Sequence, residues 1–277
     1  MLTAKQIVDN LNLTGNFLEA SVFFELVTSG RFLATAEWPY SQPTFQGTAD
    51  IIALNHHVEW GSEPLVFFAI ECKKAKPDQK VWVFDVSRTS KDMLYPMVKI
   101  DQSGRVLYER TTGYLMPSTG INSTDDAPIF NKGYELRESD GNLSRNDSER
   151  IYTSLTQANK AAISLVKSNY KDIFSVHPDA FEQHPTAIVP VVITNATIKI
   201  IKYSPKNINN QSGEISVKDV ELENKDWIFF DYPLPHDLQL NGKYGDSSIR
   251  PIKRPTYVIS APKAIEKMDE ISRYAER

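Results

Sequence analysis

The sequence predicts an α/β protein in which a central mixed β-sheet is flanked by helices, with loop insertions between them. Apolar residues recur at three- and four-residue steps near both ends of the chain, as in helices that pack on a core. Short runs rich in valine, isoleucine and phenylalanine lie between these helical segments and indicate strands. One run, residues 65–73, is apolar on both faces, which places it inside a sheet that is covered on two sides.

The first part of the chain is predicted to form one helix, a strand, a loop and two further strands. Residues 1–30 are expected to be helical, because apolar positions repeat up to Val27 and Gly30 is a suitable stop. A strand over 31–38 is expected to end at Pro39, and a loop rich in Ser, Gln, Pro and Thr to follow it as far as Gly47. The two further strands are predicted at 48–54 and 65–73.

The remainder is predicted to be mostly strands with two helices. A helix is expected from about Ser144–Asp147 to Tyr170, because its apolar residues follow one face, and a second helix is expected after Ser260. The strands are expected at 81–86, 188–193, 197–203 and 256–259, with a hairpin over 98–109, and residues 227–230 form a short apolar run.

A single domain over residues 1–277 is the expected organisation, since a chain of this length can bury one large core. Two polar stretches rich in small residues, about 111–142 and 204–255, are expected to be loop insertions in it. No internal repeat is seen.

Composition narrows the function classes. The N-terminus lacks the pattern of a secretory signal, and no apolar run reaches the roughly 18 residues needed to span a bilayer, so a cytoplasmic protein without a membrane partner is expected. A single cysteine, Cys72, excludes an internal disulfide and a multi-cysteine zinc site. The formal net charge of −4 means that nucleic-acid binding needs a local basic surface. Candidate clusters are Lys73–Lys80 and Arg250–Arg254.

The strongest chemical signal is Asp50, followed after twenty residues by Glu71-Cys72-Lys73. Side chains two apart on a strand share a face, so Glu71 and Lys73 project together. Charges at the end of an apolar strand are costly unless they are paired or bound to a metal. Asp50 begins the neighbouring predicted strand, so it could reach the same point.

Two carboxylates and a backbone carbonyl form a hard-oxygen site suited to Mg²⁺, with Mn²⁺ as the alternative. Such a metal lowers the pKa of a bound water and neutralises charge on a phosphoryl oxygen. Lys73 would orient or deprotonate the attacking water, or stabilise the developing negative charge. The expected chemistry is hydrolysis of a phosphodiester.

These residues resemble the core of the PD-(D/E)XK, or restriction-endonuclease-like, nucleases. The matching motifs are Gly47-Thr48-Ala49-Asp50 and Phe68-Ala69-Ile70-Glu71-Cys72-Lys73, and the resemblance covers residues 14–88. Where the family has proline before its aspartate, this chain has Ala49.

The resemblance implies a glutamate on the helix that precedes the sheet. Glu19 stands eleven residues before Gly30, a spacing similar to that of archaeal Holliday-junction resolvases and related restriction enzymes. Glu25 is the competing candidate. Glu19 shares a helical face with Phe23 and Leu26, at the edge of the buried stripe, and is favoured for that reason. The implied metal ligands are then Asp50, Glu71 and Glu19.

Some branches of the family also place a glutamine on a later helix near the metal, and Gln157 could take that part. The tyrosine that follows four residues later in those branches is Ala161 here. A solvent-exposed helical glutamine is the alternative interpretation.

The resemblance implies a Mg²⁺-dependent deoxyribonuclease with DNA as its partner, most simply an endonuclease of restriction, repair or phage-defence type. An exonuclease or junction-specific nuclease is a related hypothesis. The alternative from a different class is a non-catalytic nucleic-acid-binding or protein-interaction module on the same fold. Family members that cut both strands often dimerise, which makes a homodimer the corresponding expectation.

Overall fold

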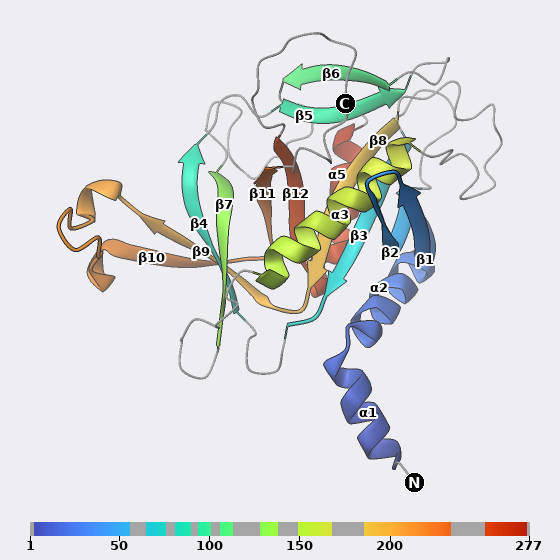
Figure 1. The fold of residues 1–277 in the computed structure, drawn as a ribbon, viewed down its shortest axis with the longest axis horizontal. Coiled ribbons are helices and arrows are strands. Elements are labelled where there is room, and N and C mark those ends of the chain that lie inside the picture. Colours follow the sequence, from blue (N-terminus) through green and yellow to red (C-terminus); the bar gives the residue numbers. More distant parts are fainter. Residues whose placement is uncertain are drawn as a thin grey trace.

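A ten-stranded mixed β-sheet with helices on both faces forms the centre of the protein (Figure 1). The computed structural model describes residues 3–55, 65–75, 81–89, 94–100, 106–112, 128–137, 149–167, 186–233 and 253–275. The structure therefore confirms the sequence prediction of an α/β protein with a central mixed sheet and flanking helices.

The sheet is built from strands near both ends of the chain. Its strands, in chain order, are β1 (Phe32–Gln42), β2 (Phe45–Asn55), β3 (Leu65–Lys73), β4 (Val81–Thr89), β7 (Pro128–Leu136), β8 (Thr186–Thr194), β9 (Thr197–Tyr203), β10 (Val220–Lys225), β11 (Trp227–Pro233) and β12 (Lys253–Ser260). A separate antiparallel pair, β5 (Leu94–Ile100) and β6 (Val106–Thr112), matches the hairpin predicted over 98–109.

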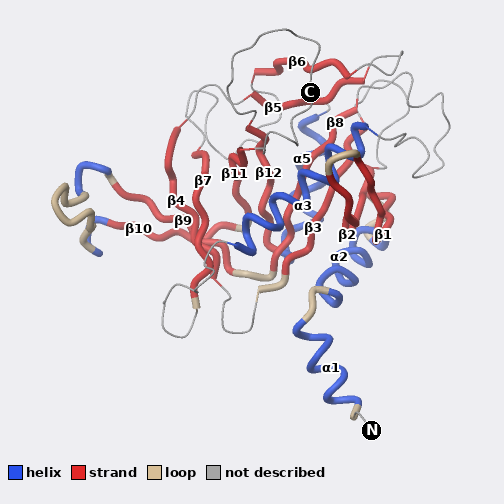
Figure 2. Tube along the Cα trace, in the orientation of Figure 1, coloured by secondary structure: helices blue, strands red, loops and turns tan. Residues whose placement is uncertain are grey.

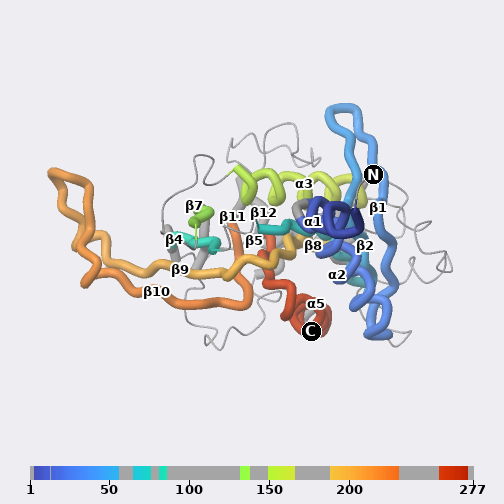
Figure 3. The backbone as a smooth tube through the Cα atoms, turned by 90° about the horizontal axis from the view of Figure 1, so that it is seen from below, coloured from blue at the N-terminus to red at the C-terminus, as the bar shows by residue number. Residues whose placement is uncertain are grey.

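The strand order is β1-β2-β3-β8-β12-β11-β7-β4-β9-β10. The first three strands are an antiparallel meander, and β3 then pairs in parallel with β8, which follows much later in the sequence. The strand that was predicted to be covered on both faces thus lies inside the sheet, with every residue but the last buried. At the other end, β9 and β10 extend away from the rest as a long hairpin (Figure 3).

Helices cover the two faces of the sheet, and each face has its own core. Helix α3 (Glu149–Lys167) packs on one face through Ile151, Leu155 and other apolar residues, and we call this side the α3 face. Helices α2 (Asn16–Thr28) and α5 (Ala264–Ala275) pack on the opposite face, and Figure 3 shows them on the other side of the sheet from α3. In the described residues no helix is both long and apolar enough to cross a membrane.

The N-terminal segment differs from its prediction, because it forms two helices instead of one. Helix α1 (Ala4–Leu13) ends at Thr14, whose hydroxyl donates a 2.7 Å hydrogen bond to Leu11 O, and α2 begins after Gly15. Helix α1 begins with a capping box between Thr3 and Gln6 and projects away from the sheet (Figure 1).

The loop predicted over 39–47 is also wrong, since β1 continues through Pro39 to Gln42 and β2 begins at Phe45. Pro39 faces Thr48 in a regular antiparallel register. Strand β1 is an edge strand of the described sheet, which is the position where strands tolerate proline.

Both predicted loop insertions contain strands of the main sheet, as the strand colouring in Figure 2 shows. Strand β7 lies within 111–142, and β10, β11 and the start of β12 lie within 204–255. Strand β7 pairs with β4, β10 with β9, and β11 with β12. This pairing holds the polar segments in extended form even though their own strand propensity is weak. Residues 113–127, 138–142 and 234–252 of these two ranges lie outside the described residues.

Candidate active site

The end of β3 carries the predicted acid and base on one face. Leu65, Phe67 and Ala69 contribute to the core beneath α3, so the alternation of the strand directs Glu71 and Lys73 to that same side. Lys73 Nζ lies 3.9 Å from Glu71 Oε1, and only 5% of Glu71 is exposed. The structure therefore brings the acid and the base together, at the point where the apolar strand ends.

Asp50 reaches this point from β2. Its Oδ2 accepts a 2.7 Å hydrogen bond from the backbone N–H of Cys72, the residue between Glu71 and Lys73. The ladder between β2 and β3 runs only from Leu54 opposite Phe67 to Ile51 opposite Ile70, so this side-chain bond takes the place of the next ladder bond. Asp50 is thus fixed beside Glu71.

Glu19 comes to the same place from the first turn of α2. A side chain at Gly15, just before this helix, would lie 3.7 Å from the carbonyl oxygen of Cys72, so the helix starts against the end of β3. Glu19 is partly buried, whereas Glu25 is exposed. Of the two candidate glutamates, the structure brings Glu19 to the carboxylates of β2 and β3.

The electrostatics reflect three carboxyl groups held close together. Burial, and then the nearby charge of Asp50, raise the pKa of Glu71 to about 8, although Lys73 opposes this shift. Burial also raises the pKa of Asp50, against the hydrogen bond from Cys72 and the charge of Lys73. The pKa of Glu19 is raised by burial, by Asp50 and by Glu37. The site carries more negative charge than its single lysine compensates.

A divalent cation suits this donor set. Every side-chain donor is a carboxylate oxygen, the ligand type that Mg²⁺ and Mn²⁺ prefer, and a cation would offset the mutual repulsion that raises these pKa values. In the part of the chain that the structure describes, no three His, Cys, Asp or Glu side chains form a ready-made metal-binding group. Mg²⁺ keeps several of its waters and needs only one or two carboxylates, so Asp50 and Glu71 are a sufficient pair of ligands.

Gln157 lies on α3 and is partly buried, which differs from a fully solvated helical side chain. Its Oε1 is buried and has no hydrogen-bond partner within the described residues. No hydrogen bond of this oxygen joins Gln157 to the carboxylates, and its part in the site stays a prediction.

The chain matches no protein-family model, no curated protein and no solved structure. Its activity is therefore inferred from the chemistry of the carboxylate site.

Two residues at the site were not predicted from the sequence, and the first of them, Tyr40, lies in the range 39–47 that was predicted to be a loop. Tyr40 is buried on the α3 face, where burial and the charges of Glu71 and Asp50 raise its pKa to about 12. It lies against Gly47 of β2, where an added Cβ would be 2.6 Å from its hydroxyl oxygen. Because a side chain at Gly47 would displace this ring, the glycine is required by the close approach.

Glu37 is the second missed residue. Its φ of 51° is the only positive value at a non-glycine residue in the described part of the chain. Such a backbone costs about 1–2 kcal/mol for a residue with a side chain. It stands on β1 between two regular pairs, Ala36 with Ile51 and Trp38 with Ala49, and so directly across from Asp50. The strained residue and the predicted metal ligand are therefore neighbours on adjacent strands.

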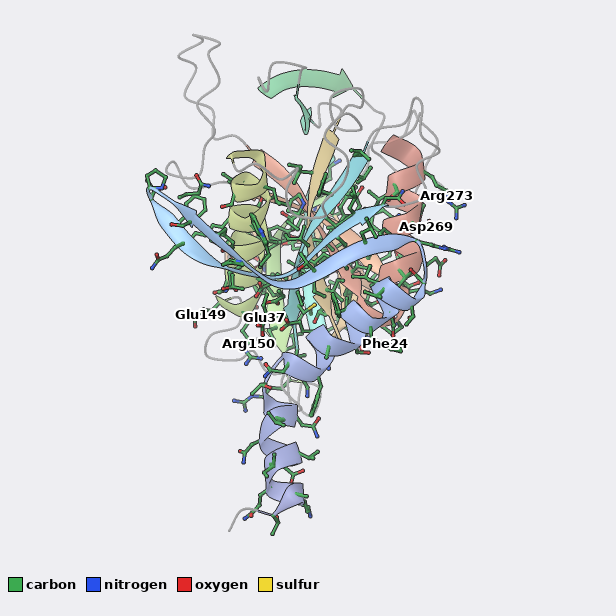
Figure 4. All side chains as sticks on the ribbon, turned by 90° about the vertical axis from the view of Figure 1, so that its right-hand side faces the viewer. Phe24, Glu37, Glu149, Arg150, Asp269 and Arg273 are labelled. Atoms are coloured by element: carbon green, nitrogen blue, oxygen red, sulfur yellow. The ribbon has the colours of Figure 1, made fainter. Side chains whose placement is uncertain are left out.

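Three contacts fix the chain directly after Lys73. Arg150 Nη1, at the start of α3, donates a 3.3 Å hydrogen bond to Lys74 O and lies 3.9 Å from buried Glu135. Asn195, between β8 and β9, accepts a 2.7 Å hydrogen bond from Ala75 N. Lys74 Nζ donates to the carbonyl oxygen of Asn12 on α1. Figure 4 labels Glu37 and Arg150, on β1 and α3 respectively. The end of β3 is thus held by elements from three parts of the chain.

A separate cavity of about 800 Å³ lies between the end of α2 and α5, and none of the predicted site residues lines it. Its arginines are already paired, because Asp269 accepts a 2.8 Å bond from Arg31 and also bonds Arg273. Asp269 and Arg273 appear together on α5 in Figure 4. The carboxylates at the end of β3 are the better candidate for chemistry.

Proposed function

We propose that the protein is a Mg²⁺-dependent deoxyribonuclease with a PD-(D/E)XK-type site on a restriction-endonuclease-like core. One observation carries the proposal: Asp50, Glu71 and Lys73 meet at the end of β3, with Asp50 bonded to the Cys72 N–H and Lys73 beside Glu71. A carboxylate pair in which Glu71 is buried and Asp50 is partly buried, next to an ammonium group, suits the hydrolysis of an anionic ester better than a structural role.

The surrounding elements support the same proposal. A helix that carries Glu19 precedes the meander, Asp50 and Glu71 lie on adjacent strands, and the sheet is mixed. These are the features that the resemblance in sequence implied. Single features of this kind occur in many proteins, so the weight lies on their combination at one point.

Each side chain has a distinct part in the proposed reaction. Asp50 and Glu71 would hold the cation, which when bound lowers the pKa of a water and offsets charge on the phosphate. Lys73 would donate a hydrogen bond to the attacking water or to a phosphate oxygen as negative charge develops there. Water adds across a phosphorus–oxygen bond, so the products are a phosphate monoester and a free hydroxyl. Cys72 contributes only its backbone N–H, which holds Asp50 in place.

A cleavage assay tests the proposal directly. Linear, closed circular and branched DNA are incubated with the purified protein, with and without Mg²⁺. We expect metal-dependent cutting, and the form of DNA that is cut separates an endonuclease from an end-dependent or junction-specific enzyme. Asp50→Ala, Glu71→Gln and Lys73→Met should each lower the rate by at least about 10²-fold, because each removes a charge that acts on the transition state.

Glu25→Gln is the matched control, since Glu25 lies on the same helix as Glu19 but is exposed. It should cut as fast as the parent protein, and thermal melts should show that all four variants fold. Cutting that survives the Asp50, Glu71 and Lys73 substitutions would refute the assignment. Binding of DNA without any cutting by the parent would favour the non-catalytic module instead.

A further inference from the structure

The two outer strands change faces at Glu37 and Asp50. On β2, Ile51 and Ala53 pack on the side of α2 and α5, whereas Ala49 packs on the α3 face. Ala49 and Ile51 are two positions apart and would share a face in a regular strand. The alternation of β2 is therefore interrupted at Asp50.

Strand β1 shows the same interruption at its partner position. Phe32 and Ala34 pack on the side of α2 and α5, but Trp38 and Tyr40 pack on the α3 face. All four have even numbers and would lie on one face if the alternation held. The residue at which the change is centred is Glu37, the one with a positive φ. Strands β1 and β2 thus change faces together at one cross-strand pair, Glu37 and Asp50.

The turn coincides with the place where β2 leaves β3. Pairing of β3 with β8 continues as far as Lys73, but pairing with β2 stops at Ile70. The Cys72 N–H consequently faces no strand partner on the β2 side and receives the carboxylate of Asp50 instead. Without the turn, the ladder between β2 and β3 would continue past Ile70. The Cys72 N–H would then bond the backbone of β2 instead of the Asp50 carboxylate.

We infer that Glu37 is a positioning residue of the candidate site: its left-handed backbone turns β1 and β2 away from β3 and so holds Asp50 on the Cys72 N–H beside Glu71. The inference rests on the proposed function only in treating Asp50 as a ligand and catalytic group. Glu37 itself acts through Asp50. Its side chain is exposed, so the backbone conformation and the carboxylate can be changed separately.

Substitutions at position 37 separate these two properties. Glu37→Gly and Glu37→Asn remove the charge but accept the left-handed conformation, which glycine and asparagine tolerate best. Glu37→Gln removes the charge alone and keeps an ordinary side chain. Glu37→Val opposes the left-handed backbone most strongly because its side chain branches at Cβ, and Glu37→Ala does so more mildly.

The chain has one cysteine, so protein labelled with ¹⁵N-cysteine gives a single backbone amide signal, that of Cys72. Asp50→Ala defines the signal when the hydrogen bond is lost. We expect the Gly, Asn and Gln variants to keep the parental chemical shift and slow hydrogen exchange. The Val variant should move to the Asp50→Ala position, with at least tenfold faster exchange. If the Val variant does not fold, the Ala variant takes its place, shifted in the same direction.

Mn²⁺ binding, measured by calorimetry on the same proteins, is the second readout. The Val or Ala variant should bind at least tenfold more weakly than the parent, and the Gly and Asn variants within about threefold of it. Parental Cys72 signals in both folded Val and Ala variants would overturn the inference, whatever the metal data show. If the signals follow the expected pattern but the parent binds no Mn²⁺, the proposed function fails and the positioning role stands.

Discussion

At the scale of single residues, Glu71 is distinctive because its carboxyl group is almost completely buried beside another acid. Burial and Asp50 raise its pKa to about 8, so without a cation much of it is protonated at neutral pH. A cation or a proton must offset its charge. The proposed site is therefore expected to respond to both pH and a divalent cation.

The raised pKa of Glu71 predicts how stability depends on pH in metal-free buffer. A carboxyl group whose folded pKa exceeds its unfolded value stabilises the fold fully below the unfolded pKa, here 4.5. That contribution is lost as the pH rises toward about 8. The free energy of unfolding should therefore fall over this window by up to about 1.4 kcal/mol per pH unit from this group.

Chemical denaturation of the parent and of Glu71→Gln across this window measures the effect. The neutral glutamine should remove most of the slope, and Mg²⁺ should flatten the parental curve by favouring the ionised carboxylates. A parental slope that the Glu71→Gln variant retains would assign the pH dependence to other groups. Asp50 and Glu19 are the next to consider, since their pKa values are raised as well.

At the scale of elements, α3 secures the end of β3 through Arg150. This residue bonds Lys74 O and pairs with Glu135, which is only 1% exposed and also accepts a hydrogen bond from Trp82 Nε1. Glu135 of β7 therefore contacts both β4 and α3, and Arg150 in turn connects α3 to the end of β3. Contacts of this kind fix the place of the site relative to the sheet.

Replacing Arg150 with methionine should destabilise the protein, because the buried carboxylate of Glu135 then loses its ion pair with the Arg150 guanidinium. We expect the free energy of unfolding to fall by about 1–3 kcal/mol. Arg273→Met is the matched control. The Arg273 side chain is exposed, and its buried partner Asp269 still accepts a bond from Arg31 when Arg273 is replaced, so the loss should cost no more than about 0.5 kcal/mol. Equal losses of unfolding free energy in the two variants would show that the Arg150–Glu135 pair stabilises the fold no more than the Arg273–Asp269 pair does.

The sequence was sufficient to predict β3 and its charged end, because both depend on short-range patterns. Apolar residues on two faces predict an inner strand, and a spacing of two places Glu71 and Lys73 on one face. The strand ends between Pro39 and Gly47 could not be predicted in this way. Proline usually ends a strand, and its acceptance here depends on β1 being outermost, which is a property of the sheet.

Tyr40 and Glu37 were missed for a related reason. Predictions from alternation assume that every residue is extended, and one left-handed residue reverses the faces of all that follow. Strand β7 was missed because its pairing with β4, and not its own composition, makes it extended. What the sequence lacked in each case was the identity of the neighbouring strand.

At the scale of the whole molecule, stability should be unevenly distributed. The sheet is buried between α3 on one face and α2 with α5 on the other, whereas α1 projects from it and leaves Ile7 and Val8 nearly half exposed. A helix of 10 residues is too short to be stable in water by itself. Among the described contacts, the bond from Lys74 to Asn12 is one that ties it to the body.

Hydrogen exchange followed by mass spectrometry should show this difference. Amides of α1 are expected to exchange at least about 10²-fold faster than those of β3 and β8, because opening α1 exposes little buried surface. The measurement is repeated after tenfold dilution. Protection of α1 equal to that of β3 would contradict the expectation, and protection that is lost on dilution would indicate association through α1.

The hydrogen bond between Asp50 and Cys72 has a further consequence for the thiol of that cysteine. Cys72 is 6% exposed, its side chain packs on the side of α2 and α5, and burial raises its pKa well above the usual range. A buried, protonated thiol does not react with alkylating reagents while the fold is closed. Modification must wait until the end of β3 separates from its neighbours, so Asp50→Ala should react at least several-fold faster than the parent, and equal rates would contradict this. The alkylation rate of Cys72 therefore measures how often the end of β3, next to the carboxylates, separates from its neighbours.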